Sequence, residues 1–187
     1  MKKNKYINVA NKSASLQIRE LKKIKKVFNK SFINAVDLIL SCKGKIICAG
    51  IGKSGLIARK ISATFSSVGI PSFFCDPAQA LHGDMGQIEK KDILLIFSYS
   101  GNTFELTNML KFANRFRIKI IGVASKSDSL LLKASDIKIL LPKVKESDVT
   151  GMVPTTSTSI TLLFGDCLAN TVMSKRNFSK EKFKLFH

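Results

Sequence analysis

The sequence predicts an α/β fold in which helices flank a parallel sheet, within a single domain of 187 residues. Two observations lead to this prediction. From Lys45 onward, short apolar runs rich in Ile, Val and Leu alternate with helical segments, as in sheets whose parallel strands are buried on both faces. The hydrophobic content of 45% is also enough to build one self-supporting core.

The expected elements follow in order along the chain. Residues 14–41 should form one long amphipathic helix, because apolar side chains from Leu16 to Ile39 recur mostly three or four residues apart. This helix is expected to cover the core; an oligomer contact also fits the pattern, and membrane-surface binding fits it less well. The strands expected after it are residues 46–49, 71–75, 92–97, 118–124 and 137–141, and the expected helices are 54–68, a segment beginning at Leu106, a short segment near Leu130, and 156–174.

The net charge of +18 would by itself favour nucleic acid or an anionic membrane as a partner. Its distribution argues against nucleic acid, because the cations are mostly scattered lysines and only Arg115 and Arg117 form a local arginine pair. No apolar run reaches the roughly 20 residues of a membrane span, and none of signal-peptide length follows the basic start of the chain. We therefore expect a cytoplasmic protein that binds neither nucleic acid nor membrane.

The four cysteines, Cys42, Cys48, Cys75 and Cys167, show neither a CxxC pair nor a metal-ligand spacing. Reduced thiols that pack in or near the core are the expected state.

A glycine-rich turn, residues 50–55, follows the first expected strand and opens a helix. Its sequence GIGKSG matches the dinucleotide fingerprint G-x-G-x-x-G, and Asp76 lies near the distance at which that motif places an acidic residue. Nicotinamide binding is therefore an alternative on spacing alone. A nucleoside-triphosphate loop is not expected, because its first glycine would fall at Ile47.

Two further turns rich in hydroxyl groups point instead to a small phosphate ester. The first, residues 98–105, lies where a strand gives way to a helix, and the amide groups and dipole of that helix favour an anion. The second, residues 154–159, begins the last helix, where simple capping explains one or two of its hydroxyls. The phosphate-binding residues expected from these turns and from the glycine turn are Ser54, Ser98, Ser100 and Thr103, with Thr155 and Ser157 as additional donors.

Four segments, GIGKSG, PSFFCDPAQALHGDMG, SYSGNTFE and PTTSTSITLLFGDCLA, resemble in order and spacing the sugar isomerase (SIS) domain of bacterial arabinose 5-phosphate isomerases. The resemblance extends from the first helix to His187. It implies a three-layer, doubly wound sandwich with a five-stranded parallel sheet, assembled as a homotetramer. It also implies interconversion of D-ribulose 5-phosphate and D-arabinose 5-phosphate, which supplies 3-deoxy-D-manno-octulosonate for lipopolysaccharide biosynthesis.

The same resemblance assigns roles to individual residues. The implied catalytic residues are Lys53, Glu105, Glu146 and His187, and the implied substrate contacts include Cys75, Asp76 and His82, the last of which is also a possible ligand of an inhibitory zinc ion. No cofactor is required. Family members commonly continue through a Ser-His-Pro-Gly-Gly segment into a pair of CBS domains, whereas this sequence ends Leu-Phe-His, so a short form without CBS domains is expected.

Aldose–ketose isomerisation moves a proton between adjacent carbons through an enediol, so it needs a base and a group that steadies an oxyanion. We expect Glu105 to be the base, because its helix follows the phosphate-type turn. Lys53 is expected to hold the enediolate or phosphate, and His82 or His187 could relay protons. The alternatives are an isomerase of another ketose phosphate and a sugar-phosphate sensor without catalysis.

Overall fold

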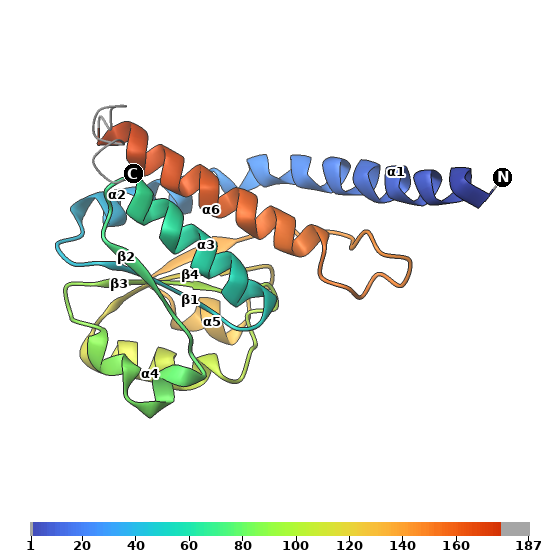
Figure 1. Cartoon of the computed structure of the whole chain (residues 1–187). Helices are drawn as coiled ribbons and strands as arrows, with labels where there is room; N and C mark the ends of the chain where they lie inside the picture. Colours follow the sequence, from blue (N-terminus) through green and yellow to red (C-terminus); the bar gives the residue numbers. More distant parts are fainter. Residues whose placement is uncertain (1, 177–187) are drawn as a thin grey trace.

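Five parallel strands form the middle layer of the structure, a computed structural model that describes residues 2–176 (Figure 1). They are β1 (Ile46–Gly50), β2 (Ser72–Cys75), β3 (Ile93–Phe97), β4 (Lys119–Ala124) and β5 (Ile137–Leu140), paired in the order β2-β1-β3-β4-β5. Strands β1 and β3 are buried along their whole length, as the apolar runs predict. The predicted five-stranded parallel sheet is confirmed.

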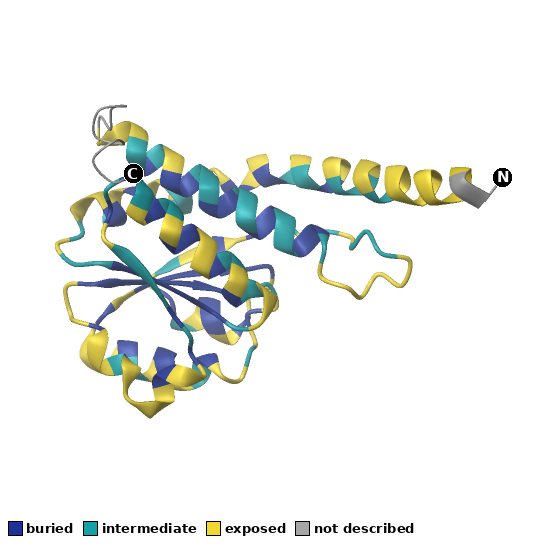
Figure 2. Cartoon of the chain, viewed as in Figure 1, coloured by how far each residue is buried: buried dark blue, intermediate teal, exposed yellow. Residues whose placement is uncertain are grey.

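Helices cover both faces of the sheet, which gives the predicted three layers (Figures 1 and 2). Successive residues of a strand enter different cores: Leu95 and Phe97 pack with one set of helices, Leu94 and Ile96 with the other. The first core takes its helical residues from η1 (Lys22–Val27), α2 (Lys30–Ser41), α3 (Lys53–Ser67) and α6 (Thr156–Lys175). The second takes them from α4 (Leu106–Phe116), α5 (Leu130–Ala134) and the short 3-10 helix η2 (Gln79–His82), which η3 (Asp84–Gln87) follows.

The N-terminal region differs from the single helix expected over residues 14–41, so that prediction is wrong in its bounds. Helix α1 (Lys2–Leu21) begins earlier and extends away from the body of the molecule (Figure 1). After η1 the chain turns at Asn29, whose Oδ1 accepts a hydrogen bond from the Ser31 amide at 2.9 Å and so caps a new helix, α2. The helical spacing of apolar residues continues through η1, whose Ile24 and Val27 are buried in the core, so the spacing alone does not reveal the break.

The sheet order creates a switch point between β1 and β3. Strand β1 continues into α3 on one face, and its neighbour β3 continues into α4 on the other. The chain therefore leaves in opposite directions at the carboxyl ends of two adjacent strands, where α/β proteins bind ligands. None of the helices within residues 2–176 is long and apolar enough to cross a membrane.

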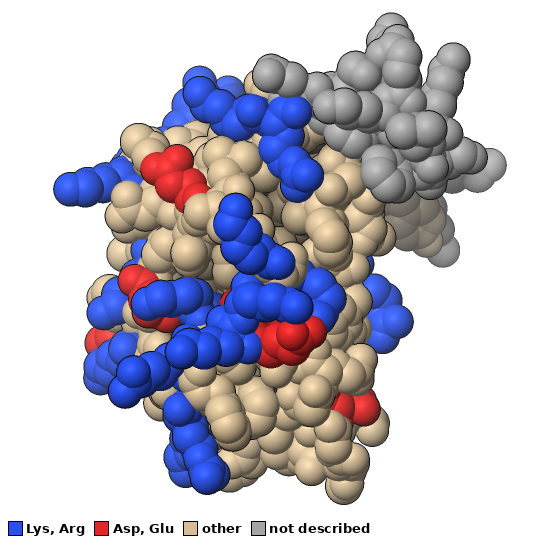
Figure 3. All heavy atoms as spheres, turned by 90° about the vertical axis from the view of Figure 1, so that its left-hand side faces the viewer, with Lys and Arg blue, Asp and Glu red and all other residues tan. Residues whose placement is uncertain are grey.

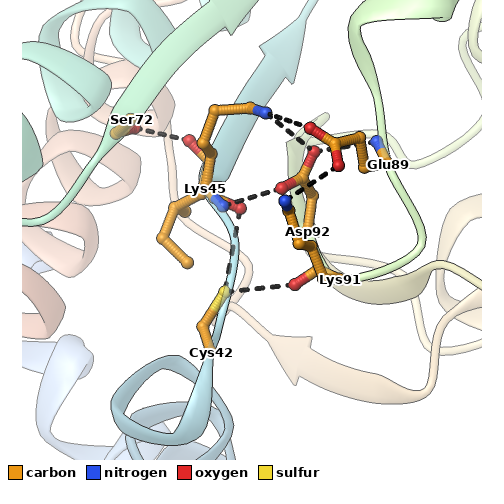
Figure 4. A network of polar contacts seen from close by, with 7 residues as sticks. Cys42, Lys45, Ser72, Glu89, Lys91 and Asp92 are labelled. Carbon is orange, nitrogen blue, oxygen red and sulfur yellow. Dashed lines mark hydrogen bonds and ion pairs between the residues drawn. The ribbon is translucent and has the colours of Figure 1, made fainter.

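The opposite, amino edge of the sheet is closed by charged contacts. The carboxylate of Asp92 is fully buried and accepts hydrogen bonds from the Lys45 amide at 2.7 Å and the Glu89 amide at 2.8 Å, while the Lys45 ammonium lies 3.5 Å away (Figure 4). Asp136 likewise accepts the Ile120 amide at 2.9 Å. Lysine and arginine side chains gather on part of this face, with a few acidic residues among them and uncharged residues over much of the rest (Figure 3). These bonds attach the starts of the strands to the loops that precede them.

Candidate active site

A cavity of about 350 Å³ lies at the carboxyl ends of β1 and β3, large enough for a small ligand. It is bordered by the start of α3, the loop after β3 and the start of α6, so the three turns singled out in the sequence meet at one place. The predicted residues that line it are Lys53, Ser54, Ser98, Ser100, Thr103, Glu146 and Ser157.

The glycine turn brings the start of α3 to the cavity. A Cβ atom on Gly50 would lie 2.9 Å from the carbonyl oxygen of Phe97, so only glycine allows β1 to run this close to the end of β3. Gly52 has a φ of +56° and, lacking a side chain, cannot itself cap the helix. Helix α3 thus begins beside the cavity without a side-chain cap, and exposed Lys53 and half-buried Ser54 of its first turn line the cavity.

The loop after β3 is held in shape by its own hydroxyl groups. Ser98 Oγ accepts a hydrogen bond from the Gly101 amide at 3.1 Å and shares one with Thr103 Oγ1 at 2.8 Å. Asn102 Oδ1 accepts the Leu130 amide at 2.9 Å and so links the loop to α5. Ser100 is exposed and lines the cavity. The loop is therefore organised before any ligand arrives.

The side-chain carboxylate of Glu146, which precedes α6 in the sequence, lies at the N-terminus of α6, where the helix dipole favours an anion. Its Oε2 accepts hydrogen bonds from the Thr155 amide at 2.9 Å, from Thr155 Oγ1 at 3.0 Å and from the Ser157 amide at 3.2 Å. Burial raises the pKa of this carboxyl, but the contacts with Ser157 and Thr155 outweigh it, so the pKa is lowered overall. Glu146 is therefore ionised at neutral pH and lines the cavity as a carboxylate.

Tyr99 was not among the predicted site residues, although it belongs to the same motif. Its hydroxyl donates to the carbonyl oxygen of Pro142 at 3.1 Å and accepts the Val144 amide at 2.9 Å, which ties the loop after β3 to the segment that leads to Glu146. Burial raises the pKa of Tyr99, so the phenol stays protonated. The other unpredicted lining residues are Ile51, Ile57, Pro154, Thr158 and Thr161.

The helical repeat could have identified two of these unpredicted lining residues from the sequence. Thr161 stands four residues after Ser157 on α6, and Ile57 stands three after Ser54 on α3, so each lies on the same helix face as a predicted residue.

Other predicted residues lie outside the lining of the cavity. Glu105 is exposed and directly precedes α4, and Thr155 donates to Glu146 instead. Asp76 accepts the amide of Ala78 at 2.9 Å, and Cys75 is buried at the end of β2, where burial raises the pKa of its thiol to about 11.

Only one of the two histidines, His82, lies within the described residues, and it is not among those that line the cavity. His82 is exposed at the end of η2, and His187 lies outside the described residues. Within residues 2–176, no group of three or more His, Cys, Asp and Glu side chains could hold a metal ion, so His82 has no zinc-binding set around it there. An inhibitory zinc ion stays a prediction. The four cysteines are free thiols, as predicted.

Comparison with known proteins matches residues 39–171 to the SIS domain family model. The "Probable arabinose 5-phosphate isomerase" of Haemophilus influenzae is 38% identical over 97% of this chain and 54% of that protein. "Arabinose 5-phosphate isomerase KdsD" of Escherichia coli K12 is 36% identical over 89% of this chain and 51% of that protein. The chain thus spans about half the length of the curated relatives it matches.

A solved structure of an Escherichia coli CFT073 protein, c3406, in complex with arabinose 5-phosphate superposes on this one with a TM-score of 0.96. The two sequences are 30% identical, and the alignment covers 100% of both chains. At this level of similarity the three layers and the strand order described above are those of the matched protein.

Proposed function

Because this chain belongs to the SIS domain family, we propose that it is a sugar-phosphate isomerase that interconverts D-ribulose 5-phosphate and D-arabinose 5-phosphate in the cavity between α3, the loop after β3 and α6. One observation carries the proposal. The cavity brings together several hydroxyl side chains and the start of α3, suited to a phosphate, with a lysine and an ionised carboxylate, suited to proton transfer. The names of the relatives, and the arabinose 5-phosphate bound by the matched structure, support the same substrate.

In the proposed complex the phosphate lies against Ser54, Ser98, Ser100 and Thr103. The hydroxyls of Ser54, Ser100 and Thr103 donate to its oxygens, Ser98 donates to Thr103, and the first amides of α3 add to the attraction. Ser157 donates to the sugar. This arrangement fixes one end of an extended substrate and leaves the carbonyl end near Lys53 and Glu146.

The chemical step needs no external oxidant or reductant. A carboxylate removes the proton from the carbon beside the carbonyl group, an enediolate forms, and the proton returns to the neighbouring carbon while the hydroxyl proton moves between the two oxygens. We assign the carboxylate to Glu146, because it lines the cavity, whereas the exposed Glu105 lies outside the lining. Lys53 balances the negative charge that develops on the enediolate oxygen.

The wider role stays part of the proposal. We propose that the reaction supplies the precursor of 3-deoxy-D-manno-octulosonate in the cytoplasm and that the protein works as a homotetramer. Exposed apolar side chains on the N-terminal helices, Tyr6, Ile18 and Ile33 among them, favour self-association. We also propose His187, which lies outside the described residues, as a catalytic residue.

The test is to incubate the purified chain with ribulose 5-phosphate, without added cofactor, and to measure arabinose 5-phosphate. Wild type should produce it, Glu146→Gln should not, and Glu105→Gln separates the two carboxylates. Turnover that survives Glu146→Gln but not Glu105→Gln would transfer the base to Glu105. Binding of the sugar phosphate without turnover in the wild type would indicate a sensor, and turnover of a hexulose or heptulose phosphate alone would indicate another isomerase.

A further inference from the structure

Helix α1 contacts the segment that carries Glu146 but does not line the cavity. This helix precedes the residues matched by the family model, which begin at residue 39. Although the outer half of α1 extends away from the body (Figure 1), its last two turns contact the segment after β5 and the start of α6. Helix α1 therefore reaches the back of the cavity wall without lining the cavity.

Glu20 makes the first of these contacts. Its side chain is only 4% exposed, although α1 is mostly solvated. Glu20 Oε2 accepts hydrogen bonds from the Lys145 amide at 3.1 Å and from the Lys23 ammonium at 2.5 Å. Lys145 directly precedes Glu146 in the sequence. The same ammonium donates to the carbonyl oxygen of Lys143 at 3.3 Å. A buried carboxylate with these partners fixes the backbone on one side of Glu146.

Gln17 makes the second contact, through a continuous chain of hydrogen bonds. Gln17 Nε2 donates to Ser147 Oγ at 3.1 Å, and Ser147 Oγ donates to Thr155 Oγ1 at 3.1 Å. Thr155 Oγ1 in turn donates to Glu146 Oε2 at 3.0 Å. The Gln17 Oε1 atom accepts from Ser159 Oγ at 3.1 Å, so the amide is anchored at both ends. This chain fixes the backbone on the other side of Glu146.

We propose that Glu20 and Gln17 are positioning residues for Glu146, so that a helix outside the family match sets the place and ionisation of the carboxylate at the cavity. The catalytic part of this inference rests on the proposed function. Loss of either contact lets the segment shift and weakens the hydrogen bonds from Thr155 and Ser157. A shift of about 1 Å in a reacting group is enough to slow a reaction strongly.

The experiment compares Glu20→Ala, Glu20→Gln and Gln17→Leu with wild type. We expect Glu20→Ala and Gln17→Leu to lower kcat about tenfold, with KM nearly unchanged, because the phosphate contacts lie on other elements. Glu20→Gln keeps an oxygen that accepts the Lys145 amide, so it should recover most of kcat. The matched control is Asp136→Ala, which removes a carboxylate bonded to a backbone amide and a lysine at the opposite edge of the sheet. Its kcat should equal that of wild type.

The pH profile separates positioning from mere loss of stability. When Glu146 loses its fixed donors its pKa rises, so the acid limb of kcat/KM should move to higher pH in Glu20→Ala and Gln17→Leu and stay in place in the control. The charge of Glu20 itself is lost in both Glu20 variants and kept in Gln17→Leu. The other charged or titratable groups near Glu146 are Lys53 and Tyr99 at the cavity, Lys145 and Asp148 on its own segment, and Lys23 on η1. All of them remain in every variant.

A carbon-13 NMR titration of labelled glutamates, assigned with Glu146→Gln, measures the same pKa without any turnover. An inactive wild type whose Glu146 pKa still rises in Glu20→Ala would refute the proposed function and leave the positioning role standing. If Glu20→Ala does not fold, Gln17→Leu gives the answer, since Gln17 is half-buried. Variants that melt earlier but keep the wild-type kcat, acid limb and Glu146 pKa would overturn the inference.

Discussion

The two edges of the sheet use the same kind of bond for opposite purposes. At the amino edge, Asp92 and Asp136 accept backbone amides and pair with lysines, and these bonds close the structure. At the carboxyl edge, Glu146 also accepts backbone amides, but it does so beside an open cavity. At the amino edge a carboxylate bound to amides stabilises the fold. At the carboxyl edge a carboxylate bound in the same way is held ready for a ligand. The comparison predicts that stability and activity can be changed separately.

The largest expected effect lies at the carboxyl edge. Glu146→Gln should lower kcat/KM by about 10³-fold, because an amide cannot take a proton, while it can still accept a hydrogen bond from the amides of α6. Thermal unfolding should change little. Steady-state kinetics and a melting curve on the same preparation test both statements, and a large fall in melting temperature with normal kinetics would reverse the roles of the two edges.

The next effect is expected at the amino edge. Asp92→Ala removes a buried carboxylate and leaves the part-buried Lys45 and Glu89 amides without their acceptor, which should cost about 3 kcal/mol of unfolding free energy. For a chain of this length that corresponds to roughly a 10 °C fall in melting temperature. Below the new transition, kcat and KM should match wild type. Altered kinetics at low temperature would show that the edges are coupled.

A smaller effect tests the phosphate end of the cavity. The single variants Ser100→Ala and Thr103→Val each remove one donor, and each should raise KM for the sugar phosphate about 10- to 100-fold, since a hydrogen bond to a charged group contributes roughly 1.5–3 kcal/mol. Ser135→Ala is the control, because Ser135 Oγ donates only to the Leu131 carbonyl in the structure as described. Equal substrate affinities in a titration would remove these hydroxyls from the site.

The smallest effect depends on pH. Burial raises the pKa of Asp136, but the Lys119 ammonium and the Ile120 amide outweigh it, so the folded pKa lies below its ordinary value. A group with a lowered pKa stabilises the fold above its unfolded pKa, and this contribution is lost as the pH falls through the folded pKa. Asp136→Asn should therefore melt slightly earlier than wild type at neutral pH and equally at strongly acidic pH. A difference that grows on acidification would contradict this.

Much of the fold could be predicted from the sequence, because the strands are apolar on both faces and the turns carry glycine or hydroxyl groups. The break at Asn29 was missed because the apolar period continues across it, so only the capping side chain marks the new helix. Glu146 had no local signal. Its surroundings form only when residues of α1 and α6, distant in the sequence, meet the segment after β5. A local sequence pattern can identify a turn, but it cannot show which carboxylate will lie beside that turn once the chain has folded.

The three hydrogen bonds that hold Glu146 all end on one of its oxygens, Oε2. In the proposed reaction the proton must then travel on Oε1. A single usable oxygen, fixed in direction, can remove and return a proton on only one side of a planar enediol. The side that it faces would decide the configuration at C2, and hence which of two epimeric aldose phosphates leaves the cavity.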